Sequence, residues 1–186
     1  MNAPARAEEK TEATDEVLME RFIQGDQEAF RGLFTRYATP LRRALLRMSG
    51  SPSQADDLLQ ITFMSVVRGR GRFQAGRRVR PWLFAVALNA ARDMKRRTRN
   101  ERPSDDGELP LTELVTPQTS DPGLQRRISQ ALGELSQPLR EAVVLHHFEN
   151  LSFSEIAEVA GCSQSAAKVR AHRGYERLRA LLEDVR

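Results

Sequence analysis

Five side chains near the carboxyl end of the chain have the types and the spacing that docking on DNA requires. They recur at three- and four-residue steps, so on a helix they form one largely basic face: Ser165, Lys168, Val169, His172 and Arg173. A helix with such an outer face can enter the major groove of DNA. The alternative is an ordinary amphipathic helix whose basic face is solvated.

The segment around these residues predicts a helix-turn-helix over residues 152–178. Ser152 and Glu155 form a capping-box pattern that opens the first helix, and Gly161 ends it. Ser163 can cap the second helix. That second helix carries a small or apolar inner face where the first helix can cross it closely: Ala167, Ala171, Gly174 and Leu178. The alternative fold for this stretch is a plain helical hairpin.

Charge is distributed unevenly along the chain. Residues 68–102 contain twelve basic residues against two acidic ones, whereas the whole chain has a net charge of only +4. Eleven of the twelve are arginines, which bind phosphates in a bidentate manner. A local charge of this size suits a phosphate backbone, because each contact releases condensed counterions. The chain therefore has two candidate nucleic-acid surfaces, one central and one carboxyl-terminal.

Composition restricts the class of protein. The 186 residues suffice for one or two small domains, and the single cysteine, Cys162, excludes an intramolecular disulfide framework. The first residues are polar and charged, unlike a signal peptide, and no apolar run approaches the ~20 residues of a membrane helix. These features predict a soluble, cytoplasmic protein that does not insert into a membrane.

Hydrophobic periodicity predicts an all-α chain of two small domains. We expect a disordered start (1–13), a first helical domain (14–99), a flexible acidic linker with four prolines (100–122) and a second domain with the helix-turn-helix (123–186). Within the first domain, Ser53 and Asp56 form a capping-box pattern that predicts the start of a helix. Pro81 is expected at the first position of another helix.

Four motifs, in this order, resemble those of an extracytoplasmic-function (ECF, group IV) sigma factor, a bacterial transcription initiation factor. They are LMERFIQGDQEAFRGLFTRY, QADDLLQITFM, RFQAGRRVRPWLFAVALNAARDMKRRTR and LSQPLREAVVLHHFENLSFSEIAEVAGCSQSAAKVRAHRGYERLR. The resemblance runs from about Val17 to Leu182. It implies a region that binds core polymerase and the −10 element, followed by one that binds the −35 element.

By this resemblance, the partner of the first domain is the RNA polymerase core, through its β and β′ subunits. Three polar residues of QADDLLQITFM face this partner: Asp56, Asp57 and Gln60. A pair of carboxylates can accept charge-assisted hydrogen bonds from arginines on such a partner. The acids could instead complement the dipole at the start of their helix.

The resemblance also implies residues for both promoter elements. Those for the melted −10 strand are Phe73, Arg77, Arg78, Arg80, Trp82, Asn89, Arg92 and Arg96, with Trp82 expected to serve mainly in packing. Those for the −35 element are Ser165, Lys168, Val169, Arg170, His172 and Arg173, with Lys168 and Arg173 reading bases and Arg170 contacting a phosphate. Val169 stands where the family often has Ser, and it could contact a thymine methyl group.

Other functions explain less of the sequence. His146 and His147 are adjacent and cannot share a helical face, and no phosphate-binding loop or nucleophile elbow is present, so we expect no catalytic residues, metal or cofactor. A helix-turn-helix regulator that is not a polymerase subunit is the alternative, but it leaves the two motifs of the first domain unexplained. Family resemblance further implies promoter DNA and an anti-sigma factor as partners.

Overall fold

The computed structural model describes residues 13–101 and 122–183, and every regular element in these ranges is helical. The first helical unit contains α1 (Asp15–Ile23), α2 (Gln27–Ser49), α3 (Pro52–Gly69), the short 3-10 helix η1 (Arg70–Arg72) and α4 (Val79–Glu101). The second helical unit contains α5 (Pro122–Gly133), α6 (Gln137–Val143), the π-helix η2 (Val144–Phe148), α7 (Phe153–Ala160) and α8 (Gln164–Glu183). The predicted all-α fold with two helical regions is confirmed.

Local signals account for most helix ends in the first unit. The Thr14 hydroxyl accepts a hydrogen bond from the Val17 amide, and the Asp26 carboxylate accepts from the amides of Glu28 and Ala29. Helix α2 ends at Gly50, whose φ of 74° is the left-handed conformation that glycine adopts without strain. These local interactions define the starts of α1 and α2 and the end of α2.

Two predicted helix starts are wrong. Helix α3 begins at Pro52, and its N-cap is Ser51, whose hydroxyl lies 3.5 Å from the Gln54 amide; Ser53 is inside the helix. Proline favours the first helical position because its ring already has the helical φ, which places the start two residues early. Helix α4 begins at Val79, so Pro81 lies within its first turn. It also continues to Glu101, past the expected start of the linker.

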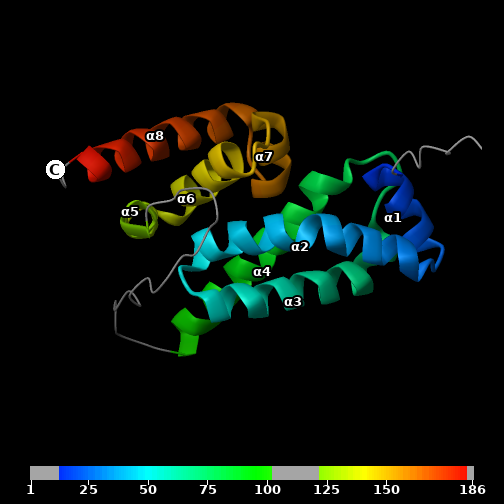
Figure 1. The fold of residues 1–186 in the computed structure, drawn as a ribbon. Helices are drawn as coiled ribbons and strands as arrows, with labels where there is room; N and C mark the ends of the chain where they lie inside the picture. Colours follow the sequence, from blue (N-terminus) through cyan, green and yellow to red (C-terminus); the bar gives the residue numbers. More distant parts are fainter. Residues whose placement is uncertain (1–12, 102–121, 184–186) are drawn as a thin grey trace, which may run out of the picture.

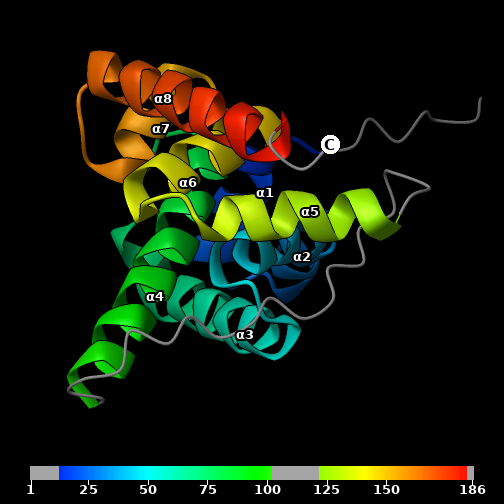
Figure 2. The same cartoon turned by 90° about the vertical axis from the view of Figure 1, so that its left-hand side faces the viewer.

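Helices α1 to α4 bury one apolar stripe each, and the second unit packs against α2 and α4 (Figure 1). Leu33, Leu41 and Leu45 of α2 are buried, and α2 packs against α1, α3 and α4. Between the units, α7 lies against α4 and η2 lies against α2. Helix α5 also lies beside α2 (Figure 2). Most of the predicted linker lies outside the described residues, as do the first twelve residues of the chain.

Candidate nucleic-acid interface

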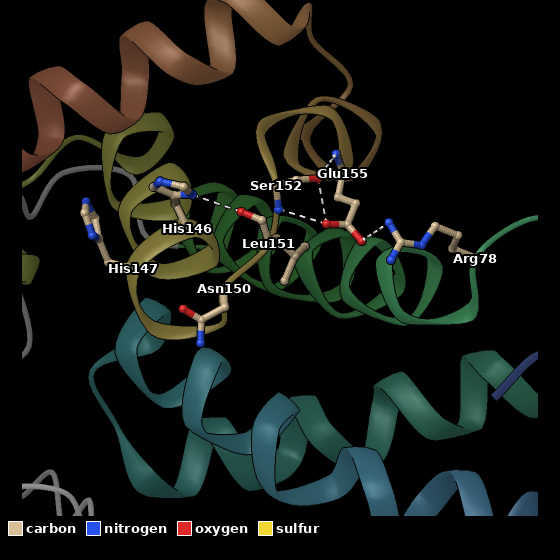
Figure 3. Close-up of a pocket in the computed structure, with 7 residues that line it drawn as sticks. All are labelled: Arg78, His146, His147, Asn150, Leu151, Ser152 and Glu155. Carbon is tan, nitrogen blue, oxygen red and sulfur yellow. Dashed lines mark hydrogen bonds and ion pairs between the residues drawn. The ribbon is translucent and has the colours of Figure 1, made fainter. Parts of the chain in front are cut away.

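Helices α7 and α8 form the predicted helix-turn-helix. The Ser152 amide donates to a carboxylate oxygen of Glu155 at 2.8 Å, and the Glu155 amide donates to the Ser152 hydroxyl, so the capping box is complete (Figure 3). Gly161 ends α7 with a φ of 65°. The Ser163 hydroxyl then accepts from the Ala166 amide at 3.1 Å and opens α8. All three predicted signals are confirmed.

Helix α8 approaches α6 so closely that only glycine fits at the crossing. Ala167, Ala171, Gly174 and Leu178 are all buried, as predicted. A Cβ atom on Gly174 would lie 2.6 Å from a methyl carbon of Val143 and 3.0 Å from the carbonyl oxygen of Leu139. The second unit therefore holds α8 rigidly on α6, with the opposite face directed outward.

That opposite face of α8 is accessible. Its five predicted residues are all exposed, and Val169, an apolar residue, has 47% of its surface in contact with solvent: Ser165, Lys168, Val169, His172 and Arg173. Arg170 is only half-buried and lies at the flank of this face. His172 pairs with Glu176 one turn further on, at 3.2 Å. This face is accessible to a partner such as a DNA groove, and it presents the basic Lys168 beside the apolar Val169.

The three predicted polymerase-contact residues are exposed on α3, but one of them already has a partner. The carboxylate of Asp56 accepts two hydrogen bonds from Arg42 of α2, at 2.5 and 3.1 Å. These hydrogen bonds hold the pKa of Asp56 below its ordinary value. Asp57 and Gln60 are exposed as well. A partner that binds the Asp56 carboxylate must therefore displace Arg42 or contact both side chains.

An exposed apolar stripe that was not predicted from the sequence lies beside these residues. Ile61, Met64 and Val67 are all exposed on α3, and Phe34 of α2 is exposed as well. Large exposed apolar groups in contiguous positions often mark a protein contact. One feature of the sequence indicates such a stripe, because α3 has more apolar residues than a single buried face can accommodate. Together with Asp56, Asp57 and Gln60, these residues define what we call the α3 surface.

The loop before α4 places its aromatic residue inside the protein. Phe73 is only 8% exposed, and its ring packs edge-on against Trp82, with ring centroids 5.2 Å apart. The Val79 amide donates to the Glu16 carboxylate and ties the end of the loop to α1. Trp82 is half-buried against the core, in line with its expected packing role. A base that reaches Phe73 would have to displace Trp82 or the loop.

The predicted −10 residues on the loop and on α4 form two groups. Arg77, Asn89 and Arg96 are exposed, and Arg96 pairs with Asp93 of its own helix at 3.0 Å. In contrast, three arginines reach into the second unit: Arg78, Arg80 and Arg92. The sequence predicts all six on one nucleic-acid surface and gives no sign of contacts between the units.

Within the described residues, no group of three or more His, Cys, Asp or Glu side chains could hold a metal ion. No helix in these ranges is long and apolar enough to cross a membrane.

Comparison with known proteins identifies both helical units. Residues 33–101 match the family model for Sigma-70 region 2, and residues 125–178 match that for Sigma-70 region 4. The chain is 46% identical over 170 residues to the RNA polymerase sigma factor CarQ of Myxococcus xanthus, covering 90% of this chain and 97% of CarQ. It is 32% identical to the ECF RNA polymerase sigma factor SigF of Caulobacter vibrioides, over 95% of this chain and 96% of SigF.

A solved structure has the same fold. The sigma factor RpoE of Bartonella quintana, determined in complex with the anti-sigma factor NepR, superposes with a TM-score of 0.74 at 26% identity, covering 84% of this chain and 98% of RpoE. Region 2 followed by region 4 defines the class of sigma-70-type transcription initiation factors. Within that class, the chain belongs to the ECF RNA polymerase sigma factors. It is thus an initiation factor that binds RNA polymerase and directs it to specific promoters.

Proposed function

We propose that the two helical units divide promoter recognition between them. Residues 14–99 bind core polymerase and the melted −10 strand, and residues 123–186 bind the −35 element, with residues 100–122 as the linker. The single observation that carries this proposal is the outward basic face of α8, held by a close crossing over α6. The factor performs no chemistry of its own and acts in the cytoplasm, where polymerase and promoter DNA meet.

On α8, Lys168 and Arg173 read bases or their shape, and Val169 packs against a thymine methyl group. Arg170, at the flank, binds a backbone phosphate. Ser165 and His172 complete the contact, with His172 released from Glu176. The exposure of these side chains, with Arg170 half-buried at the flank, supports this assignment of roles.

On the first unit, Arg77, Asn89 and Arg96 are the −10 contacts that are accessible without rearrangement. Arg78, Arg80 and Arg92 join them once they leave the second unit. Phe73 and Trp82 line the loop and support it. A basic groove with planar side chains nearby is what a single strand requires.

The α3 surface contacts core polymerase. Asp56, Asp57 and Gln60 supply hydrogen-bond acceptors, and the apolar stripe supplies buried area. We also infer an anti-sigma factor as a partner, since the related RpoE of Bartonella quintana was determined with one. This partner would compete with polymerase for surfaces of the first unit.

A pull-down with core polymerase tests the α3 surface. Asp56→Arg combined with Asp57→Arg should abolish core binding, because it places positive charge where we expect arginines on the partner. The matched control is Glu20→Arg combined with Glu28→Arg, two charge reversals at other exposed positions of the first unit. Unchanged helicity by circular dichroism shows that the fold persists. Wild-type affinity in the double variant would exclude this surface.

A further inference from the structure

Helix α1 contacts both ends of the loop that precedes α4. This loop, residues 73–78, connects η1 to α4, and α1 packs against both of these elements (Figure 1). At one end, the guanidinium carbon of Arg70 in η1 lies 5.7 Å from the centre of the Phe22 ring of α1. At the other end, the Val79 amide donates to a carboxylate oxygen of Glu16 at 3.3 Å. One helix therefore holds the loop at its start and at its finish.

The hydrogen bond from Val79 to Glu16 caps α4 from a different helix. Val79 is the first residue of α4 and is fully buried. The first amides of a helix find no acceptor within that helix, and leaving a buried amide without a partner is costly. A negative charge at this end also complements the helix dipole. Glu16 thus gives the start of α4 both an acceptor and a favourable charge.

The neighbouring residue, Asp15, fixes the place of Glu16. The Asp15 carboxylate accepts hydrogen bonds from Arg36 at 2.8 Å and from the Tyr37 hydroxyl, both on α2. Burial and the hydrogen bond to Asp15 raise the pKa of Tyr37, so this hydroxyl remains a donor at neutral pH. The start of α1 is therefore anchored on α2 at the point where it reaches α4.

Between these anchors, the loop has a defined conformation. The Arg77 amide donates to the carbonyl oxygen of Gln74 at 3.2 Å, which closes a four-residue turn. Gly76, the third residue of this turn, has a φ of 84°, which favours glycine there. Phe73 packs on Trp82 and fixes the start of the loop. The exposed Arg77 side chain thus leaves a closed turn whose two ends are both held.

We propose that Glu16 is a positioning residue for the melted −10 strand, because its capping of α4 holds loop 73–78 in the conformation that receives the strand. The inference rests on the proposed function of this loop. Glu16 acts through the backbone of α4 and touches no DNA itself. A loop that is already ordered loses less conformational entropy on binding, which raises its affinity. The match to Sigma-70 region 2 begins at residue 33, so α1 lies outside it.

Trp82, the only tryptophan of the chain, can report the state of the loop. It packs on Phe73 in the first part of α4. In the free full-length factor, Glu16→Ala should shift the Trp82 emission to the red and increase its quenching by acrylamide, with unchanged helicity by circular dichroism. Glu16→Gln keeps an acceptor oxygen and should restore most of the wild-type signal. The matched control is Glu20→Ala, which removes an exposed acid one turn along α1 and should leave the signal unchanged.

Strand opening by holoenzyme tests the consequence for function. On a promoter fragment selected by the wild-type holoenzyme, Glu16→Ala should lower the open-complex fraction, measured by permanganate reactivity, about threefold to tenfold, the effect of losing one hydrogen bond. Closed-complex formation should stay at the wild-type level, and Glu16→Gln should restore opening.

Three results would overturn the proposal. The first is a Glu16→Ala variant with wild-type Trp82 emission and quenching. The second is an equal loss of closed and open complexes in that variant, which would mean a general structural role. The third is an equal loss of opening in Glu16→Gln, which would mean that the charge acts rather than the capping acceptor.

Arg77→Ala separates failure of this proposal from failure of the proposed function. Arg77 is an exposed −10 candidate on the loop itself. If Arg77→Ala reduces opening while Glu16→Ala does not, the loop binds the strand without help from α1, so the −10 assignment stands and the role of Glu16 falls. If neither variant reduces opening, the −10 assignment of the loop fails, and the role of Glu16 fails with it.

Discussion

Lys168, Arg170 and Arg173 carry similar charges on one helix, yet their positions predict different roles. Lys168 and Arg173 lie on the exposed face of α8, whereas Arg170 is half-buried at its flank. A good base contact contributes roughly 1–3 kcal/mol of discrimination, whereas a phosphate contact is nearly blind to sequence. The three residues can therefore be told apart by comparing DNA sequences rather than by affinity alone.

For Arg170→Ala, we expect holoenzyme to bind cognate and scrambled −35 sequences more weakly by similar factors, with a salt slope smaller by about 1. Lys168→Ala or Arg173→Ala should instead narrow the difference between the two sequences. Fluorescence anisotropy at several salt concentrations measures both quantities. If all three variants lose affinity by the same factor for cognate and scrambled −35 sequences, α8 positions the protein without reading bases.

Glu149 is the residue whose ionisation should affect stability near neutral pH. Burial raises its pKa from 4.5 to about 7, although the charges of Arg47, Arg43 and Arg80 act in the opposite direction. Because the folded state favours the protonated form, the stabilisation from Glu149 is complete below about pH 4.5 and is lost as the pH rises through about 7.

Glu149→Gln should remove this pH dependence. Its free energy of unfolding relative to wild type should increase by about 1–3 kcal/mol between about pH 5 and pH 8. Urea denaturation at a series of pH values measures the difference between the two proteins, so that the other titrating groups largely cancel. Parallel stability curves for variant and wild type would show that Glu149 is ionised throughout.

At the scale of elements, the crossing of α6 and α8 determines how firmly the recognition helix is held. An extra methyl group at Gly174 has no room between Val143 and the Leu139 carbonyl. We expect Gly174→Ala to destabilise the protein by about 1–3 kcal/mol, because overpacking outweighs the better helix propensity of alanine. Thermal unfolding followed by circular dichroism measures this change.

Gly69→Ala is the matched control for that substitution. Gly69 is the last residue of α3, and an added Cβ there would meet nothing within 4 Å. The melting temperature of the Gly69→Ala variant should stay within about a degree or two of wild type. That shift corresponds to a change in the free energy of unfolding of about a few tenths of a kcal/mol. Equal losses in both variants would mean that the destabilisation is not due to crowding at the crossing.

The helix-turn-helix could be predicted from the sequence because its signals are local. Ser152, Glu155, Gly161 and Ser163 act on backbone groups within four residues of themselves, so they need no tertiary information. The start of α3 was misplaced because two serines flank Pro52, and only the proline geometry distinguishes between them. The exposed apolar stripe of α3 could not be assigned, since periodicity does not show which apolar residues remain outside the core.

At the scale of the whole molecule, the contacts between the two units were beyond sequence reasoning. Arg92 and Glu141 are 49 positions apart, and Arg80 and Glu149 are 69 positions apart. No local rule pairs such residues, and an arginine-rich segment is equally consistent with a free surface. The positions of the arginines were predictable, but their partners in the second unit were not.

The most direct test of two-site promoter recognition is to sequence the DNA selected by reconstituted holoenzyme from a random library. We expect two enriched blocks at a nearly constant spacing. Holoenzyme carrying Lys168→Ala and Arg173→Ala should lose the upstream block and keep the downstream one, whereas Arg96→Ala should weaken the downstream block. Enrichment of a single block would contradict two-site recognition. An upstream block that persists unchanged when Lys168 and Arg173 are replaced by alanine would contradict it as well.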